Sequence, residues 1–257
     1  MPRLGKLGGT RKLAYKHFNI IGMTESEADS RIAPIYTSFP EIQTTILAGP
    51  KGIALHMYRW FEAQEDPGDL KDPGDLKDPR DLDELAAKIH EALGDAIFST
   101  SGELLEQVVG QMLRQSGNTL SVAESCTGGM LGMHITRIPG SSDYFLGGIL
   151  CYSNEAKKNL CGVPEELLQK HGAVSAEVAE ALARGVRDAL HSTIGLSITG
   201  IAGPGGATAE KPVGLVYIGL SDGTRTMSSQ RILPGDRDTI RERSTYLALM
   251  LLRKFLM

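Results

Sequence analysis

The sequence predicts an α/β protein: a three-layer α/β/α domain with a largely parallel or mixed sheet, preceded by a small α+β domain. The chain has 257 residues, a length that suits one large domain or two modest ones. Its 41% apolar and 23% charged residues are an ordinary globular balance. From residue 99 onward, short apolar strands alternate with helical segments, which is typical of layered α/β folds.

Residues 1–98 carry the signals of a small α+β domain. Thr24 can cap a helix, because Glu27 stands three residues later and can reach back to it. Gly94 ends a second segment of helical spacing. The expected elements are a helix after Thr24, strands at Thr44–Leu47 and Ile53–Phe61 joined by a turn at 48–52, and a helix at Leu82–Leu93.

An acidic repeat interrupts this domain. Residues 61–100 carry 12 Asp or Glu against 4 Lys or Arg. The hexapeptide Asp-Pro-Gly-Asp-Leu-Lys occurs at 66–71 and 72–77, and a variant follows at 78–83. Proline and glycine in these units oppose a helix, and three units of six residues are too few for a solenoid. We therefore expect a surface loop over residues 65–83, with a binding segment as the alternative.

Residues 99–257 are expected to form the α/β domain. Ligands in such sheets bind outside the carboxyl ends of the strands, so the loops after the first three expected strands are the ones to inspect. The expected strands are Leu120–Ala123, Gly148–Tyr152, Ile194–Ile198 and Gly214–Leu220. The expected helices are Leu104–Leu113, Met130–Ile135, Glu155–Leu160 capped by Asn154, Ala176–Ala189 and Arg237–Phe255.

Two of these loops are rich in glycine. Glu124–Gly129 leads from a strand into a helix, and Thr199–Gly206 leaves another strand. Such loops turn backbone N–H groups outward, which suits a phosphate or another anion. The alternatives are a cap with a tight turn for the first loop and a flexible lid for the second.

The segment between these loops contains serines followed by a lysine. A Ser–Lys pair is a known alternative to Ser–His, and Lys157 lies one expected strand beyond Ser141 and Ser142. Lys157 could act as a base only if its pKa fell, because at about 10.4 roughly one lysine in 2,500 is neutral at pH 7. Tyr152 could hold the lysine or relay its proton. The plainer alternatives are a capping Ser142, a packed Tyr152 and a solvated Lys157.

Other classes of chemistry have weaker signals. Cys126 stands at an expected helix N-terminus, where a thiol pKa falls, but no histidine is near it in sequence. The six histidines show no metal-ligand spacing, so we expect no metal. Three cysteines suit a reducing cytoplasm, where we place the protein. A net charge of −4 gives no reason to expect a nucleic-acid partner, and no apolar run is long enough for a membrane.

Several blocks together resemble the C-terminal domain of the CinA family, the bacterial nicotinamide-nucleotide amidases. The resemblance covers about residues 99–257, and residues 1–98 are similar to the small KH-like middle domain of full-length CinA proteins. The matching blocks are Ala123-Glu-Ser-Cys-Thr-Gly-Gly129, Pro139-Gly-Ser-Ser142, Tyr152-Ser-Asn-Glu-Ala-Lys157, His171-Gly-Ala-Val-Ser175, Thr199-Gly-Ile-Ala-Gly-Pro-Gly-Gly206, Lys211-Pro-Val-Gly214 and Pro234-Gly-Asp-Arg237.

The resemblance implies hydrolysis of the carboxamide of nicotinamide mononucleotide to nicotinate mononucleotide and ammonia, without a metal or organic cofactor. It implies Ser142 as the nucleophile, with Lys157, Tyr152 and Arg237 beside it. The glycine loops would bind the substrate phosphate, and a homodimer is expected. The substrate-binding residues expected from these loops are Ser125, Thr127, Gly128, Gly129, Thr199, Gly200, Ala202 and Gly203.

Two alternatives accompany this hypothesis. The runner-up is a non-catalytic interaction protein in competence or DNA-damage responses. The other is a truncated gene product whose missing domain performed the main activity. The chain also lacks the N-terminal molybdopterin-binding-like domain of full-length relatives, so we do not expect the ADP-ribose pyrophosphatase activity attributed to that domain. Gly49-Pro-Lys-Gly52 has the GxxG spacing of nucleic-acid-binding KH domains, but we interpret it as the hairpin turn.

Overall fold

The computed structural model describes residues 11–62 and 80–257. The chain divides into two compact units, residues 1–102 and residues 103–257. This division falls four residues after the domain boundary expected from the sequence. The two units are mixed α/β structures: the first holds a four-stranded sheet and the second a five-stranded sheet.

The first unit is an antiparallel sheet with helices on one face. Its strand order, β2-β3-β1-β4, is that of the split βαβ, ferredoxin-like arrangement. The core holds Ile20 and Leu55 from the sheet and Ile32 and Ile89 from the helices, all fully buried. The elements are β1 (Arg11–Ile20), α1 (Glu25–Tyr36), β2 (Gln43–Gly49), β3 (Gly52–Glu62), α2 (Arg80–Leu93), a 3-10 turn (Gly94–Ala96) and β4 (Ile97–Ser99).

The local signals of this unit are largely confirmed. Thr24 caps α1 together with Glu27, and residues 49–52 form the turn between β2 and β3. Gly52 has a φ of +120°, which glycine adopts readily. The KH-like assignment stays a prediction, since what the structure shows is the split βαβ order. Sequence reasoning missed β1 and β4.

The acidic repeat falls mostly outside the described residues, which resume at Arg80. The end of its third unit, residues 80–83, is the first turn of α2, so the loop expected to reach residue 83 ends earlier. Helix formation here agrees with the charge pattern, because Asp81 and Asp83 stand in the first turn, near the positive end of the helix dipole.

The second unit is built on a mixed sheet of order β6-β5-β7-β8-β9. Strand β5 pairs in parallel with β6 and β7, whereas β7 pairs with β8 and β8 with β9 in antiparallel. The expected α/β class is therefore right, with a sheet that is only partly parallel. The strands are β5 (Leu120–Glu124), β6 (Phe145–Leu150), β7 (Ile194–Gly200), β8 (Leu215–Ser221) and β9 (Thr226–Ile232).

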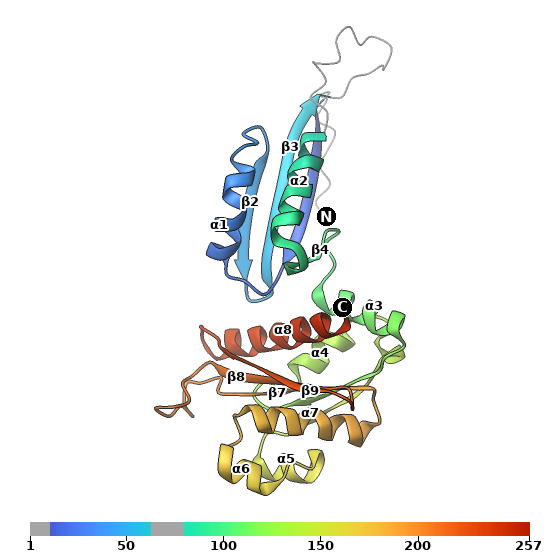
Figure 1. Cartoon of the computed structure of the whole chain (residues 1–257), viewed down its shortest axis with the longest axis vertical. Coiled ribbons are helices and arrows are strands. Elements are labelled where there is room, and N and C mark those ends of the chain that lie inside the picture. The colour runs from blue at the N-terminus through green and yellow to red at the C-terminus, as the bar shows by residue number, and fades with distance from the viewer. Residues whose placement is uncertain (1–10, 63–79) are drawn as a thin grey trace. The chain divides into compact units, whose positions relative to one another are not determined.

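Helices lie on both faces of this sheet (Figure 1). On one face α8 packs on β7 and β8 and against α3 and α4, and on the other α7 packs on β5, β7 and β8 and carries α5 and α6 on its outer side. No helix in the described part of the chain is both long and apolar enough to cross a membrane. The helices are α3 (Leu105–Ser116), α4 (Met130–Thr136), α5 (Asn154–Cys161), α6 (Glu165–His171), α7 (Ala176–Leu190) and α8 (Arg237–Leu256). Sequence reasoning missed the helix α6 and the strand β9.

Glycine allows α7 to approach the sheet closely. A Cβ on Gly195 of β7 would lie 2.0 Å from the carbonyl oxygen of Ala183 in α7, and a Cβ on Gly219 of β8 would lie 2.2 Å from that of Ala179. Real side chains do not tolerate such distances, so these two positions fix the depth at which α7 packs.

We expect Gly195→Ala to destabilise the protein by about 1–3 kcal/mol, because the added methyl group must push α7 away from the sheet. Gly49→Ala is the control, since nothing lies within 4 Å of its Cβ, and it should change stability by less than about 0.5 kcal/mol. Urea-induced unfolding measures both variants. Equal stabilities of Gly195→Ala and the unsubstituted protein would contradict the packing argument.

Candidate active site

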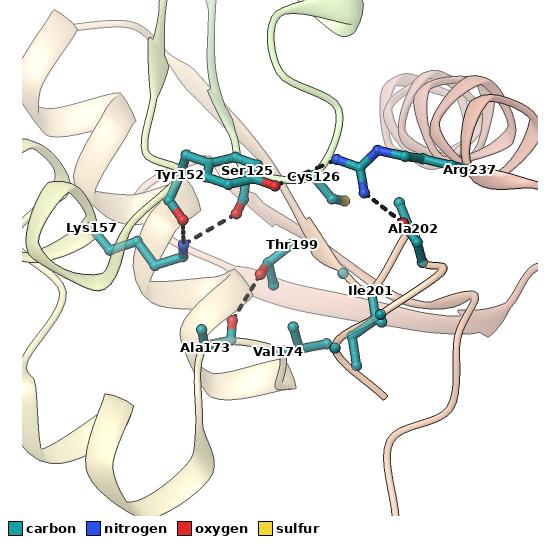
Figure 2. Close-up of a pocket in the computed structure, with 14 residues that line it drawn as sticks. Ser125, Cys126, Tyr152, Lys157, Ala173, Val174, Thr199, Ile201, Ala202 and Arg237 are labelled. Carbon is teal, nitrogen blue, oxygen red and sulfur yellow. Dashed lines mark hydrogen bonds between the residues drawn. The ribbon is translucent and has the colours of Figure 1, made fainter. Parts of the chain in front are cut away.

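A pocket opens where the parallel strands of the second unit end (Figure 2). Parallel pairing aligns the ends of β5, β6 and β7, so the residues after each strand meet at one edge of the sheet. The cavity has a volume of about 230 Å³. Its lining residues are Ser125, Cys126, Tyr152, Lys157, Ala173, Val174, Thr199, Gly200, Ile201, Ala202, Gly203, Gly205, Gly206 and Arg237.

Lys157 is the buried amine of this pocket. It stands in the first turns of α5, whose cap is Ser153 rather than the expected Asn154. Its side chain is not solvated, because the residue is 1% exposed. The Nζ atom lies 3.1 Å from Ser125 Oγ, 2.8 Å from the carbonyl oxygen of Cys151 and 3.1 Å from that of Tyr152. Burial lowers the pKa of Lys157, because it removes water from the charged form.

These three contacts suit a neutral amine as well as an ammonium ion. An ammonium group donates to all three oxygens. A neutral amine donates its two hydrogens to the carbonyls of Cys151 and Tyr152, which cannot donate in return. Its lone pair then faces Ser125 Oγ, which can donate its own hydrogen. The geometry therefore places the Lys157 amine, a potential proton acceptor, within hydrogen-bond distance of the Ser125 hydroxyl.

Ser125 is held at the end of β5. It directly follows β5, and its N–H donates to the carbonyl of Ile198 in β7 at 3.0 Å. Its own carbonyl accepts from the N–H of Gly128, closing a tight turn. Ser125 is 8% exposed, yet its side chain lines the cavity. It was predicted to bind substrate, and the structure brings it into contact with Lys157.

Ser142 lies near the amino ends of the parallel strands, whereas the pocket lies at their carboxyl ends. It belongs to a 3-10 turn, Ser141–Asp143, that precedes β6. Because β6 runs parallel to β5, Phe145 lies beside Leu120 at the amino end, and the chain crosses the sheet before it reaches Lys157. The expectation that the returning chain brings Lys157 near Ser142 is therefore wrong.

Arg237 and Tyr152 meet at the rim of the pocket. Arg237 opens α8, whose cap is Asp236. Its Nη1 donates to the carbonyl of Gly203 at 2.7 Å and its Nη2 to the hydroxyl of Tyr152 at 3.4 Å. Tyr152 is 65% exposed, so it is not a packed strand residue. Its carbonyl contacts Lys157, whereas its hydroxyl faces Arg237 (Figure 2).

The two glycine loops contribute unequally. Of the residues predicted to bind substrate, Thr199, Gly200, Ala202 and Gly203 line the pocket, whereas Thr127, Gly128 and Gly129 are not among the lining residues. The second loop is also anchored, because Thr199 Oγ1 donates to the carbonyl of Ala173 at 2.8 Å.

Sequence reasoning missed part of the wall. Ala173 and Val174 come from the segment before α7. The block His171–Ser175 was already among the segments that carried the family resemblance, and this was the available signal, because Ala173 and Val174 have no charged or nucleophilic side chain. Ile201, Gly205 and Gly206 belong to the second loop, which was expected at the site, but they were not among the expected binding residues.

Cys126 lines the pocket beside Ser125. Burial raises the pKa of its thiol to about 11. The thiolate is the reactive form of cysteine, so at neutral pH Cys126 is a poor nucleophile. The sequence-based alternative of a thiol activated by a helix N-terminus therefore has no support in this geometry.

The fold and the pocket define a mixed α/β protein with a buried serine–lysine pair at the carboxyl ends of its parallel strands. The chain belongs to the CinA family: a model of the "CinA C-terminal domain" matches residues 102–256. It is 46% identical over 242 residues to a "CinA-like protein" of Koribacter versatilis, covering 94% of this chain and 56% of the relative. It is 42% identical to a "Putative competence-damage inducible protein" of Moorella thermoacetica, covering 98% and 58%. The chain thus spans little more than half the length of these curated relatives.

Solved structures share the fold. The competence/damage inducible protein CihA from Agrobacterium tumefaciens superposes with a TM-score of 0.56 and 36% identity, covering 58% of this chain and 91% of that one. A CinA superfamily protein from Klebsiella pneumoniae gives a TM-score of 0.58 and 28% identity, covering 59% and 95%. The names of these proteins describe induction and family membership and state no reaction.

We expect the native protein to resist thiol reagents at pH 8, because Cys126, Cys151 and Cys161 are all buried and the pKa of Cys126 is raised. Titration with dithionitrobenzoate should detect no fast-reacting thiol in the folded protein and three after unfolding in guanidinium. Rapid reaction of one native thiol, mapped to Cys126 by mass spectrometry, would show that this thiol is activated.

Proposed function

We propose that the protein hydrolyses the carboxamide of nicotinamide mononucleotide, giving nicotinate mononucleotide and ammonia. The observation that carries the proposal is the contact between the buried Lys157 Nζ and Ser125 Oγ, 3.1 Å long, inside a pocket of the second unit. A nucleophile with an adjacent base is the arrangement that acyl-transfer chemistry needs. The reaction itself is what the family resemblance implies, transferred to the serine that contacts the lysine.

The first half-reaction forms an ester. Ser125 Oγ attacks the carboxamide carbon while neutral Lys157 takes the hydroxyl proton. The tetrahedral oxyanion is stabilised by backbone N–H groups of the pocket wall, each contributing about 3 kcal/mol. Lys157 then gives its proton to the departing ammonia. In the second half-reaction, water activated by Lys157 cleaves the nicotinoyl ester and restores the serine.

The second glycine loop and Arg237 form the side of the pocket that suits the substrate phosphate. Arg237 uses one N–H on Gly203 and another on Tyr152, and its guanidinium fork has five N–H groups in all. A phosphate placed against the loop of Ile201–Gly206 would receive the remaining donors. Tyr152 supplies an exposed ring at the rim, against which a flat pyridine ring can pack.

Ser125→Ala and Lys157→Met should each reduce ammonia release from nicotinamide mononucleotide by a factor of about 10³ or more, because each removes one half of the nucleophile–base pair. Ser142→Ala is the matched control. Ser142 is exposed at the far edge of the sheet, so its variant should keep a rate within about twofold of the unsubstituted protein.

The assay is ammonia release in the presence of EDTA, with circular dichroism to show that each variant is folded. A Ser142→Ala variant without activity beside an active Ser125→Ala variant would reverse the assignment of the nucleophile. Absence of ammonia release by the folded, unsubstituted protein would remove the amidase and favour the interaction protein in competence or DNA-damage responses.

Arg237→Gln should distinguish substrates with and without a phosphate. Loss of a charge-assisted hydrogen bond costs about 1.5–3 kcal/mol, so kcat/KM for nicotinamide mononucleotide should fall by roughly 10- to 150-fold. The value for nicotinamide riboside, which has no phosphate, should change far less. A similar loss for both substrates would mean that Arg237 acts through Tyr152 and Gly203 instead.

A further inference from the structure

Glu124 is a buried carboxylate directly before the proposed nucleophile. It ends β5 and is 1% exposed. Its Oε2 accepts hydrogen bonds from the backbone N–H groups of Gly129 at 3.0 Å and Leu131 at 3.1 Å. Its Oε1 accepts from the N–H of Gly132 at 2.8 Å. One side chain thus satisfies three of the N–H groups at the start of α4, which would otherwise have no partner within the helix.

The hydrogen bonds from these N–H groups compensate for the burial of the Glu124 carboxylate. Among residues 11–62 and 80–257, no Lys, Arg or His lies within ion-pair distance of its carboxylate. A buried carboxylate is costly unless hydrogen bonds compensate for its lost water. Conversely, the three N–H groups are costly to leave buried without an acceptor. The carboxylate and the start of α4 therefore depend on each other, and the turn between them is closed tightly.

The turn has a second anchor on its other side. Arg241 of α8 donates through Nη2 to the carbonyl of Thr127 at 2.9 Å. Gly128 and Gly129 have φ angles of +61° and +98°, which let the chain reverse between the two anchors. Ser125 lies within this clamped segment, between Glu124 and Thr127, and its hydroxyl has to meet Lys157.

We propose that Glu124 is a positioning residue for the reaction. By binding the start of α4, it fixes the turn that aims Ser125 Oγ at Lys157 Nζ. This inference rests on the proposed function and deepens it. It has a second consequence: the carboxylate already occupies the N–H groups of Gly129, Leu131 and Gly132. A substrate phosphate therefore has to bind at the other glycine loop.

Glu124→Gln tests the proposal, because an amide of the same shape must turn an NH₂ group toward at least one N–H donor. We expect kcat for nicotinamide mononucleotide to fall by roughly 10- to 100-fold while KM stays within about threefold, since a displacement near 1 Å can cost about 10² in rate. Hydrogen exchange of the amides of Gly129, Leu131 and Gly132 should become faster.

The matched control is Glu106→Gln. Glu106 is an equally buried carboxylate of the same unit, 2% exposed, and it contacts His134 Nδ1 at 3.2 Å outside the pocket lining. Its variant should lose thermal stability as Glu124→Gln does, but keep kcat within about twofold. Glu124→Asp retains both acceptor oxygens on a shorter side chain and should keep a higher kcat than Glu124→Gln. If Glu124→Gln does not fold, the kcat and exchange of Glu124→Asp carry the test.

The possible outcomes separate the two proposals. Unchanged kcat and unchanged exchange in Glu124→Gln would overturn the positioning role, as would an equal loss of kcat in Glu106→Gln. An unsubstituted protein that releases no ammonia would overturn the proposed function. In that case the exchange of the three amides still decides whether Glu124 holds the turn, and unchanged exchange would overturn the clamp.

Discussion

The parallel pairing of β5 with β6 on one side and β7 on the other is the constraint on which the site depends. It brings the ends of three strands to one edge of the sheet, so that Ser125, Tyr152 and Thr199 meet although 74 positions of sequence separate the first from the last. Strand β8 runs antiparallel to β7, and β9 runs antiparallel to β8, so β9 again has the direction of β7 but is separated from it by β8. If one of these three strands ran in the opposite direction, the residues that follow it would lie at the other end of the sheet, and the pocket would not form.

Two ionisable side chains are buried at this edge of the sheet, and different hydrogen-bond partners compensate for the water that each has lost. Lys157 is surrounded by oxygen acceptors, two of them carbonyls, and the loss of water lowers the pKa of its amine. Glu124 is surrounded by N–H donors of the backbone. Each side chain therefore has partners of the opposite polarity supplied largely by the main chain. Main-chain partners are fixed by the fold, so the geometry does not depend on mobile side chains.

The sequence predicted the helices and strands better than it predicted which residues contact one another. Tyr152, Lys157 and Arg237 were expected near the site and they line the pocket. Ser142 was expected with them because only fifteen positions separate it from Lys157. The strand β6 (Phe145–Leu150) lies between them, and its direction carries the chain across the sheet. The segments before and after a strand lie at its opposite ends, so the expected strand between Ser142 and Lys157 already argued against a contact between them.

A similar limit explains the loops. The glycine-rich segment Thr199–Gly206 was interpreted as an anion site, and most of its residues line the pocket. In the segment after β5 the same composition was interpreted as an anion site, but the acceptor of its N–H groups is the neighbouring Glu124. A carboxylate inside a glycine-rich turn was the signal for an internal partner. Only the three-dimensional contacts show that the carboxylate points inward.

All the described residues that line the pocket belong to the unit of residues 103–257. A substitution at residues 11–62 or 80–102 therefore replaces no residue of the pocket wall. The tandem hexapeptides at 66–83 likewise contribute no residue to the described lining. Their number can consequently change without changing the residue composition of that wall.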